Sequence, residues 1–521
     1  MDKQDSRGQY EGCEYSHRTL TALLPSQHDA DIIFESSNGW MILDGVYRAS
    51  AEIYVNKDKQ SYALDMRAVA KERPIIVART LVHLAICLNS LPPEFACSRL
   101  SSIWNLDSTM QNYVTTVTSI VASSDEQMMT LHGLEVLLLL ALYHLNNASL
   151  RQSWLTIRRG LNLAHLMGFQ RIITEKELDP PIPAVSNAKQ IWRSFVDLDC
   201  YLSLHLRLPF GAEDYPIAED YYCHLAHRAK INAINRQVAE LDREISPQGY
   251  SLALAVDERL ESCVREMPKE FWEVPNIPST ARSPESSAAL ERLMVQMWHF
   301  ETKIFIHLPY LLRAHHDDRY DYSKVTALQA SRNVLMRWFA LRNSNITQAF
   351  CRMAEIGVFI AAVTLTLDIV IELGTKDKIE VQKTKGTDFA MICRLIGEME
   401  KLAKASPREK TAARSAVVLK KILSSLDPNK QPLGKSQHTI PFFGTVELDF
   451  KKLPVRAGFN LDSDAGKMMN ATATGHHLPV FSFTNNSLWP QPELDSENEF
   501  DWDMVLFDGL EDRDTEGNWM F

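Results

Sequence analysis

The residues best suited to bind another molecule lie at the end of the chain, in the segment 487–521. This segment holds 11 acidic residues and one base, so it carries ten of the eleven net negative charges of the chain. Aromatic and aliphatic side chains stand between the acids. Such alternation is typical of disordered segments that activate transcription. Repulsion between the carboxylates would keep the segment open and its rings in water. A short helix could then enter the groove of a partner.

Six apolar side chains of this tail are predicted to make that contact, with transcription machinery or a coactivator as the partner. They are Phe500, Trp502, Met504, Val505, Leu506 and Phe507. Two other interpretations fit the same residues. The tail could only solubilise the protein, or it could form a final helix packed on the core of its own chain. In that last case the basic segment 401–421 would be its natural neighbour.

Residues 401–421 hold seven bases and one acid, a local charge of +6. A basic helix can contact phosphate, serve as a nuclear import signal or dock an acidic partner. Ala412, Ala416, Leu419 and Ile422 recur at helical spacing, however. The favoured interpretation is therefore an amphipathic helix with a solvated basic face. Reading of DNA bases is not expected here, because neither dimerisation heptads nor interleaved aromatics accompany the charge.

Catalytic and metal-binding patterns are missing from the sequence. It contains no Gly-x-Gly-x-x-Gly, Walker A, Gly-x-Ser-x-Gly or His-Glu-x-x-His motif, and none of its eight cysteines forms a Cys-x-x-Cys pair. His315–Asp318 has metal-binding residue types, but neighbours on a helix diverge by about 100° and cannot all face one ion. His476-His477 reads as a loop. We predict no catalytic residue, metal or cofactor and expect no enzymatic role, although distant residues could still assemble a triad.

Composition favours a helical, soluble protein. The chain has 521 residues, is 45% hydrophobic and 23% charged, and holds 20 glycines. That glycine share lies below the usual value of about 7%, which disfavours glycine-turned β architectures. The first twenty residues contain no apolar run, so no secretory signal is expected. The most apolar stretch, 356–367, is too short to span a membrane and is predicted to be a buried core helix.

Apolar residues recur at helical spacing from Leu20 to about residue 426, and no two-residue alternation precedes residue 430. The predicted fold is all-α, with about a dozen helices. Ser149 and Gln152 are expected to form a capping box at the start of one helix, which Gly168 should end. A long helix should begin at Pro284, and Pro309 should bend or break it.

Composition divides the chain into four parts. Residues 1–19 are polar and predicted to be flexible, and residues 20–426 form the helical domain. Residues 427–486 are rich in Pro, Gly, Asn, Ser and Thr and are predicted to be an irregular linker. Residues 487–521 are the acidic-aromatic tail. We therefore expect a multi-helix domain followed by a long, irregular, partly disordered C-terminal tail.

Residues 149–216 resemble the middle homology region of fungal binuclear zinc-cluster transcription factors, also called the fungal-specific transcription factor domain. The chain departs from that pattern at Arg193, at Cys200 and at Arg207-Leu208, where the family has glycine-arginine. Residues 296–343 are similar to later helices of the same family, and the resemblance covers about residues 20–370. The motif residues that this chain keeps, with an expected structural role, are Gly168, Trp192, Asp199, Pro209 and Phe210.

The resemblance implies a nuclear transcription regulator, and regulation of a secondary-metabolite gene cluster is a plausible setting. The helical domain would dimerise, with itself or with a zinc-cluster family member, or sense a small ligand. The family's DNA-binding module needs six cysteines in two clusters, and these 521 residues contain no such cluster. DNA contact is therefore expected only indirectly, through a partner or an upstream exon. The alternative is a helical ligand-binding or scaffold protein with no direct transcriptional role.

Overall fold

The computed structural model describes the helical body of the chain and one β-hairpin. The six tail residues predicted to bind a partner lie outside the described residues, as does the rest of 450–521. The described stretches are 14–37, 64–92, 95–174, 183–216, 223–241, 247–276, 284–314, 317–343, 351–375, 378–406, 408–424, 435–440 and 444–449.

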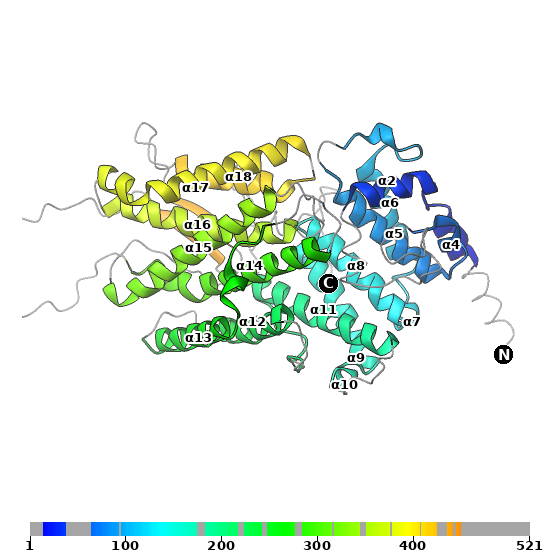
Figure 1. The fold of residues 1–521 in the computed structure, drawn as a ribbon, viewed down its shortest axis with the longest axis horizontal. Helices are drawn as coiled ribbons and strands as arrows, with labels where there is room; N and C mark the ends of the chain where they lie inside the picture. Colours follow the sequence, from blue (N-terminus) through cyan, green and yellow to red (C-terminus); the bar gives the residue numbers. More distant parts are fainter. Residues whose placement is uncertain are drawn as a thin grey trace, which may run out of the picture.

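Within the described residues, the N-terminal half consists almost entirely of helices and their short connections. A first helix covers residues 14–21, so it begins inside the segment 1–19 that was expected to be flexible. The helices that follow run from the end of the molecule coloured blue towards its cyan middle in Figure 1. They are α2 (Gln27–Ser36), α4 (Met66–Val69), α5 (Pro74–Asn89), α6 (Leu106–Ile120), α7 (Asp125–Met128), α8 (Leu131–Asn146), α9 (Leu150–Leu166) and α10 (Phe169–Ile172), with a short 3-10 turn, η2 (Cys97–Arg99).

Longer helices make up the remainder of the body. Twelve of the described helices have 15 residues or more, in agreement with the predicted all-α fold. Two further 3-10 turns, η3 (Lys269–Trp272) and η4 (Asp318–Tyr320), connect them. The helices are α11 (Pro183–Leu206), α12 (Cys223–Glu240), α13 (Pro247–Arg265), α14 (Pro284–Leu311), α15 (Asp321–Arg342), α16 (Cys351–Thr375), α17 (Lys378–Ala405) and α18 (Lys410–Ser424).

A two-stranded hairpin follows the last helix. Strand β1 (Lys435–Ile440) pairs antiparallel with β2 (Gly444–Asp449), and Ile440 lies opposite Gly444 beside the turn. This segment belongs to the 427–486 region that was expected to be irregular. The abundant turn-forming residues around it obscured two short pairs of strand-favouring residues, Thr439-Ile440 and Thr445-Val446.

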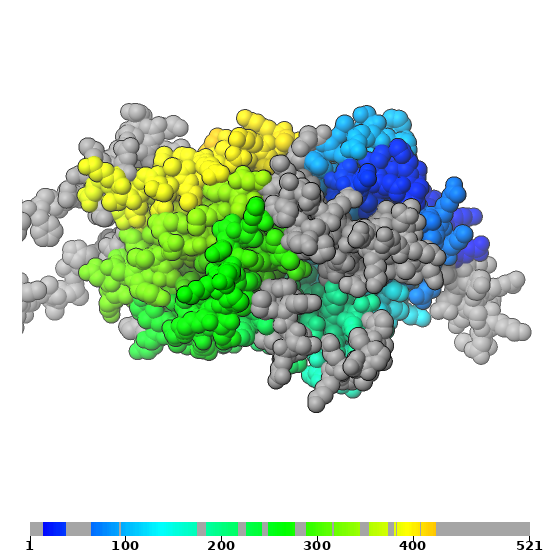
Figure 2. Space-filling view, viewed as in Figure 1, coloured from blue at the N-terminus to red at the C-terminus, as the bar shows by residue number. Residues whose placement is uncertain are grey.

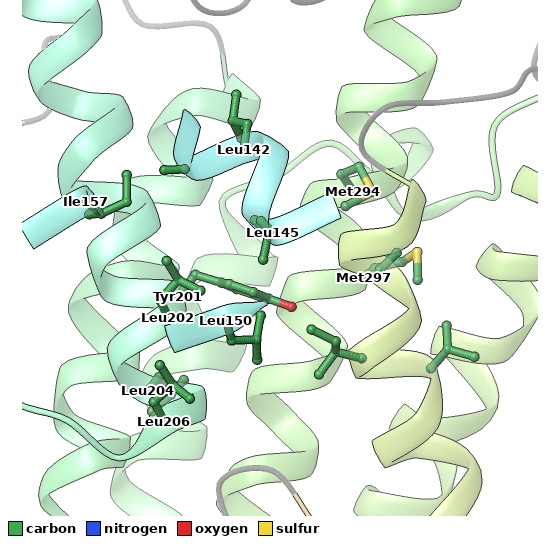
Figure 3. Packing of buried hydrophobic residues seen from close by; sticks show 14 of the residues in the cluster. Leu142, Leu145, Leu150, Ile157, Tyr201, Leu202, Leu204, Leu206, Met294 and Met297 are labelled. Atoms are coloured by element: carbon green, nitrogen blue, oxygen red, sulfur yellow. The ribbon is translucent and has the colours of Figure 1, made fainter. Parts of the chain in front are cut away.

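The buried apolar residues form one large cluster that runs through the helical body. Figure 3 shows part of it, where side chains of α8, α9, α11 and α14 converge around Tyr201. Burial of apolar surface contributes roughly 25 cal/mol per Å², so this cluster is the main source of stability. The residues labelled in Figure 3 are Leu142, Leu145, Leu150, Ile157, Tyr201, Leu202, Leu204, Leu206, Met294 and Met297.

Helix α16 lies at the centre of the C-terminal half, in contact with α8, α14, α15, α17 and α18. Its stretch Ala354–Leu373 is the one described segment long and apolar enough to cross a membrane, yet 94% of that apolar window is buried inside the protein. A helix that is apolar on all sides is expected in the interior of a large domain. The prediction of a buried core helix at 356–367 is confirmed.

The observed helix ends agree only in part with those predicted from the sequence. Gly168 has φ +82° and ends α9, as predicted, because this left-handed backbone favours glycine. The capping box at Ser149 is wrong, since its side chain makes no cap hydrogen bond. Only three residues join α8 to α9, and the Ser149 backbone N–H instead closes a tight turn onto His144 O at 2.9 Å. Pro309 does not break α14, which continues to Leu311.

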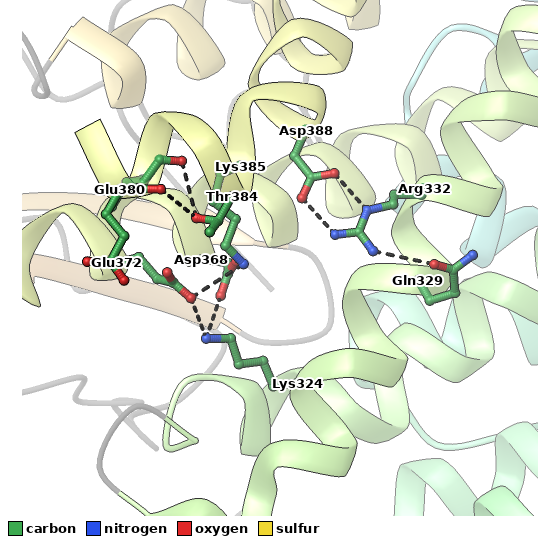
Figure 4. Close-up of polar contacts among 10 residues, drawn as sticks. Lys324, Gln329, Arg332, Asp368, Glu372, Glu380, Thr384, Lys385 and Asp388 are labelled. Carbon is green, nitrogen blue, oxygen red and sulfur yellow. Dashed lines mark hydrogen bonds and ion pairs between the residues drawn. The ribbon is translucent and has the colours of Figure 1, made fainter. Parts of the chain in front are cut away.

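Four charged side chains join the last long helices (Figure 4). Asp368 and Glu372, both buried on α16, lie between Lys324 of α15 and Lys385 of α17. Lys385 Nζ is 2.5 Å from Asp368 and 3.4 Å from Glu372, and Lys324 Nζ is 2.8 Å from Glu372 and 3.3 Å from Asp368. Each buried carboxylate therefore contacts two cations, which compensates its loss of water.

Candidate functional site

The motif residues that carry the family resemblance lie around the contact between α9 and α11. Asp199 and Trp192 are on α11, Gly168 follows α9, and Pro209 and Phe210 follow α11. The structure links Asp199 and Pro209 through one side chain. Arg158 Nη1 donates to Asp199 Oδ1 at 3.2 Å and to the Pro209 carbonyl at 3.3 Å.

Asp199 is the centre of this arrangement, because its buried carboxylate accepts from three groups. The backbone N–H of Gly211 donates to Asp199 Oδ2 at 2.6 Å, and Ser203 Oγ donates to Oδ1 at 3.3 Å. Arg158 is the third donor and supplies the opposite charge. A buried carboxylate is stable only when its oxygens are paired in this way. Asp199 thus fixes the segment after α11 against α9.

Four residues of this site were missed as site residues by the sequence analysis. Trp154 Nε1–H donates to Ser203 Oγ at 2.9 Å, and the Arg158 guanidinium lies over the Trp154 ring at 5.2 Å from its centroid. A Cβ on Gly211 would collide with that guanidinium. The spacing of Trp154 and Arg158, one helical turn apart, was the available signal for an aromatic–cation pair.

Trp192 and Phe210 anchor the two sides of the site. The buried Trp192 ring packs edge-on against His165 of α9, with centroids 4.9 Å apart. Phe210 lies under the Arg236 guanidinium of α12, 4.8 Å from its centroid. The motif residues therefore tie α9, α11 and α12 together.

Arg207 ends α11 in a left-handed backbone conformation. It has φ +58°, and the next backbone N–H, that of Leu208, donates to Ser203 O at 2.9 Å to close the end of α11. This left-handed conformation is the one that glycine adopts without strain. This chain places arginine at that position, at a cost of about 1 kcal/mol.

Asp257, His307 and Ser323 form a second buried polar cluster, with the residue types of a catalytic triad. His307 Nε2 lies 3.3 Å from Asp257 Oδ1, and His307 Nδ1 lies 2.9 Å from Ser323 Oγ. Burial alone would raise the pKa of Asp257, but contacts with His307, Tyr322 and Lys303 lower it to about 2. Ser323 and His307 are fully buried, so this serine is closed to a substrate in the described structure.

The remaining sequence candidates are only partly covered by the described residues. Asp317 pairs with Arg319, with Nε at 2.9 Å from each carboxylate oxygen, and no group of three or more metal-binding side chains occurs within the described residues. His315, His316 and His476-His477 lie outside them. The inner stripe of the basic helix is confirmed, since its four apolar members are all buried. They are Ala412, Ala416, Leu419 and Ile422.

Two buried histidines, His227 of α12 and His299 of α14, lie side by side with ring centroids 5.4 Å apart. Trp272 packs against both, at 5.3 and 4.6 Å. Among the described groups, no hydrogen-bond partner reaches either ring nitrogen of His227. Burial, with a smaller effect of Lys230, lowers the pKa of His227 to about 4. Burial lowers the pKa of His299 as well, so both imidazoles are neutral at pH 7.

We expect His227→Phe to reduce the acid sensitivity of the protein. The pKa of His227 lies below its ordinary value of 6.5 in the folded state, so the unfolded chain takes up the proton first as pH falls. Stability is therefore lost between about pH 6.5 and 4, and phenylalanine removes that loss. Melting temperatures at several pH values test this. Parallel curves for wild type, His227→Phe and the exposed-site control His28→Phe would contradict it.

The chain has relatives among fungal regulatory proteins. It is 30% identical over 424 residues to transcription factor sdnS of Sordaria araneosa, a match that covers 79% of this chain and 54% of that protein. It is 28% identical over 366 residues to a dehydrocurvularin biosynthesis regulator of Aspergillus terreus, covering 67% and 50%. Probable transcription factor gsfR1 of Penicillium aethiopicum is 24% identical over 431 residues, covering 78% and 60%. These relatives of the chain are named as fungal transcription factors and biosynthesis regulators.

The chain spans about half the length of the curated relatives it matches. No family model matches it. Among solved structures, a chain of the K. lactis CBF3 core is similar with a TM-score of 0.41 and 13% identity, covering 68% of this chain and 78% of that chain. The names of these relatives agree with the expectation of a fungal transcription factor. One of them is named as a regulator of a biosynthesis.

Proposed function

We propose that this protein regulates transcription of a secondary-metabolite gene set in a fungus. The observation that carries this proposal is its 30% identity, over 79% of the chain, to a protein named as a transcription factor. A second relative is named for the biosynthesis that it regulates. In this proposal the protein acts by recruiting other proteins, and the acidic-aromatic composition of residues 487–521 supports that mechanism.

The helical body and the C-terminal tail differ in charge. Residues 1–486 are almost neutral, whereas the tail 487–521 is strongly acidic and rich in aromatic residues. In our proposal the helical body supplies a stable scaffold, with Asp199 holding its motif region together. The tail supplies the contact with transcription machinery or a coactivator, through the six apolar residues from Phe500 to Phe507.

In this proposal DNA is bound by a partner protein or by residues outside this sequence, and not by these 521 residues. These 521 residues contain no Cys-x-x-Cys pair, so they cannot build the six-cysteine cluster of the family. The proposal therefore places the protein in the nucleus, on DNA through a partner of the zinc-cluster family or through residues outside this sequence. Self-association of the helical body belongs to the same proposal.

The tail can be tested apart from the rest of the chain. We expect residues 487–521, fused to a heterologous DNA-binding domain, to raise reporter output. Trp502→Ala with Phe507→Ala should remove most of that output, because anchoring aromatics dominate such contacts. The matched control, Trp519→Ala, changes an aromatic outside the predicted contact. An inactive wild-type fusion would favour the alternative, a helical ligand-binding or scaffold protein without a transcriptional role.

The setting is tested in the source organism. We expect deletion of the gene to change transcript levels of one co-located biosynthetic gene set. Unchanged transcript levels under conditions where the gene is expressed would contradict the proposed function.

A further inference from the structure

Arg337 of α15 is a buried cation whose hydrogen-bond partners are all neutral. Its Nε–H donates to Gln296 Oε1, its Nη1 donates to Asn333 Oδ1 and its Nη2 donates to the Trp272 carbonyl, each at 2.8 Å. Burial and the nearby charge of Arg292 lower the pKa of Arg337 to about 10, so it stays charged at pH 7, and no described carboxylate offsets them. A buried charge normally has a counter-charge, because the loss of water is costly.

A second guanidinium, that of Arg292 on α14, lies on the same turn. Its acceptors are also neutral, namely the backbone carbonyls of residues 270, 271 and 273. The two arginines therefore hold the η3 turn by its carbonyl groups. The acids of this turn, Glu270 and Glu273, have exposed side chains. Two positive charges thus converge on one turn, and their hydrogen bonds within the described residues go to uncharged acceptors.

Buried nitrogen atoms lie beside this turn. Trp272 Nε1, both ring nitrogens of His227 and Nδ1 of His299 have no hydrogen-bond partner among the described groups. The Trp272 ring packs against His299 and His227, with centroids 4.6 and 5.3 Å apart. Buried polar groups in native proteins are almost always paired, with protein, water or ligand. Four unpaired nitrogens on three adjacent rings are therefore exceptional.

The ring of Phe300 connects the buried charge to these rings. The Arg337 guanidinium lies over Phe300, 4.5 Å from its centroid, and Phe300 packs against His299 at 5.2 Å and Trp272 at 6.0 Å. Helix α14 contacts both α12 and α15, and all three belong to the green to yellow-green part of the chain in Figures 1 and 2. The result is a positively charged cluster, lined by rings, whose nitrogens can donate hydrogen bonds.

A small carboxylate fits these groups best. It brings one negative charge to Arg337 and accepts from the Trp272 N–H, and from the N–H that each neutral imidazole carries. Water would pair the nitrogens, but it would leave Arg337 without a counter-charge. Phosphate would bring a second negative charge, which costs more to desolvate beside one fully buried cation. The ring centroids lie 4.6 to 6.0 Å apart, so only a small or flat molecule can reach their edges.

We infer that the interior between α12, α14 and α15 binds a small organic carboxylate, with Arg337 as its counter-charge and Trp272, His227 and His299 as its hydrogen-bond partners. The proposed function gives the helical body the role of a scaffold, and this inference adds a ligand to it. The inference does not depend on the transcriptional role. Binding is measured on the protein itself, so either can fail while the other holds.

The first experiment tests the class of ligand. Full-length protein is titrated calorimetrically at pH 7 and constant ionic strength with acetate and with benzoate. At least one should bind saturably, with a dissociation constant of about 1 mM or lower, and should raise the melting temperature at saturation. The neutral analogues acetamide and benzamide should not bind, and neither should inorganic phosphate. No saturable binding of either carboxylate, equal binding of its amide, or preferred binding of phosphate would overturn the inference.

The second experiment tests the site. Arg337→Met should weaken binding of the carboxylate about tenfold or more, because its counter-charge is lost. The matched control Arg332→Met, on the same helix, removes a guanidinium that pairs with Asp388 and should leave the affinity unchanged. Equal weakening by both variants would contradict the role of Arg337.

A further variant separates binding from folding, since Arg337 also holds the η3 turn. Trp272→Phe keeps an aromatic ring and removes one unpaired N–H, so it should leave the melting temperature within about 5 °C of wild type. It should still weaken carboxylate binding about tenfold, because a hydrogen bond to a charged group is lost. Wild-type affinity in Trp272→Phe would show that the carboxylate binds elsewhere and would overturn the assignment.

Discussion

Asp199→Ala is expected to lower the free energy of unfolding by about 3 kcal/mol, one of the two largest effects we foresee. The buried carboxylate accepts from the Gly211 N–H at 2.6 Å, Arg158 at 3.2 Å and Ser203 at 3.3 Å. Alanine leaves the Gly211 N–H without this acceptor and a half-buried guanidinium without its counter-charge. Urea denaturation followed by circular dichroism measures the change.

Two comparisons isolate the cause. Asp199→Asn keeps the shape and one acceptor oxygen, so it should cost about half as much. Asp125→Ala removes an exposed carboxylate that lies 2.6 Å from Arg159, and it should cost less than about 1 kcal/mol. If Asp199→Ala were no more damaging than Asp125→Ala, the Asp199 carboxylate would not hold the motif region together.

Lys385→Met is the second large effect, with an expected loss of about 3 kcal/mol. Lys385 contacts both Asp368 and Glu372, which are buried on α16 (Figure 4). Methionine preserves the length of the side chain but removes the charge, so the two carboxylates must share Lys324 alone. The free energy of unfolding at pH 7 gives the size of the effect.

The pH dependence identifies the mechanism. A carboxylate that loses a cation has a higher folded-state pKa, so the folded variant binds protons more readily as pH falls. The deficit of Lys385→Met relative to wild type should therefore shrink between pH 7 and about pH 4. Lys401→Met, which removes an exposed partner of Glu398, serves as the control and should show almost no deficit. A deficit independent of pH would point to lost packing instead.

Much of the architecture could be predicted because it depends on local patterns. Helical spacing of apolar residues predicted the all-α body, and the most apolar stretch, 356–367, predicted the buried α16. Gly168 predicted the end of α9, since a positive φ is a property of one residue. The capping box at Ser149 failed because the three-residue connection from α8 imposes its own turn. Residue types alone do not show such a constraint.

The sequence by itself determined the helices, the concentration of acidity in 487–521 and the absence of a cysteine cluster within these residues, because composition and periodicity are local properties. Only the tertiary structure decided which polar groups meet. The carboxylate of Asp199 reaches Gly211 and Arg158, which lie 12 and 41 residues away. Asp257, His307 and Ser323 line up only after α13, α14 and α15 have packed. Long-range partners are selected by the packing of whole helices, which minimises unpaired buried charge and unfilled volume together.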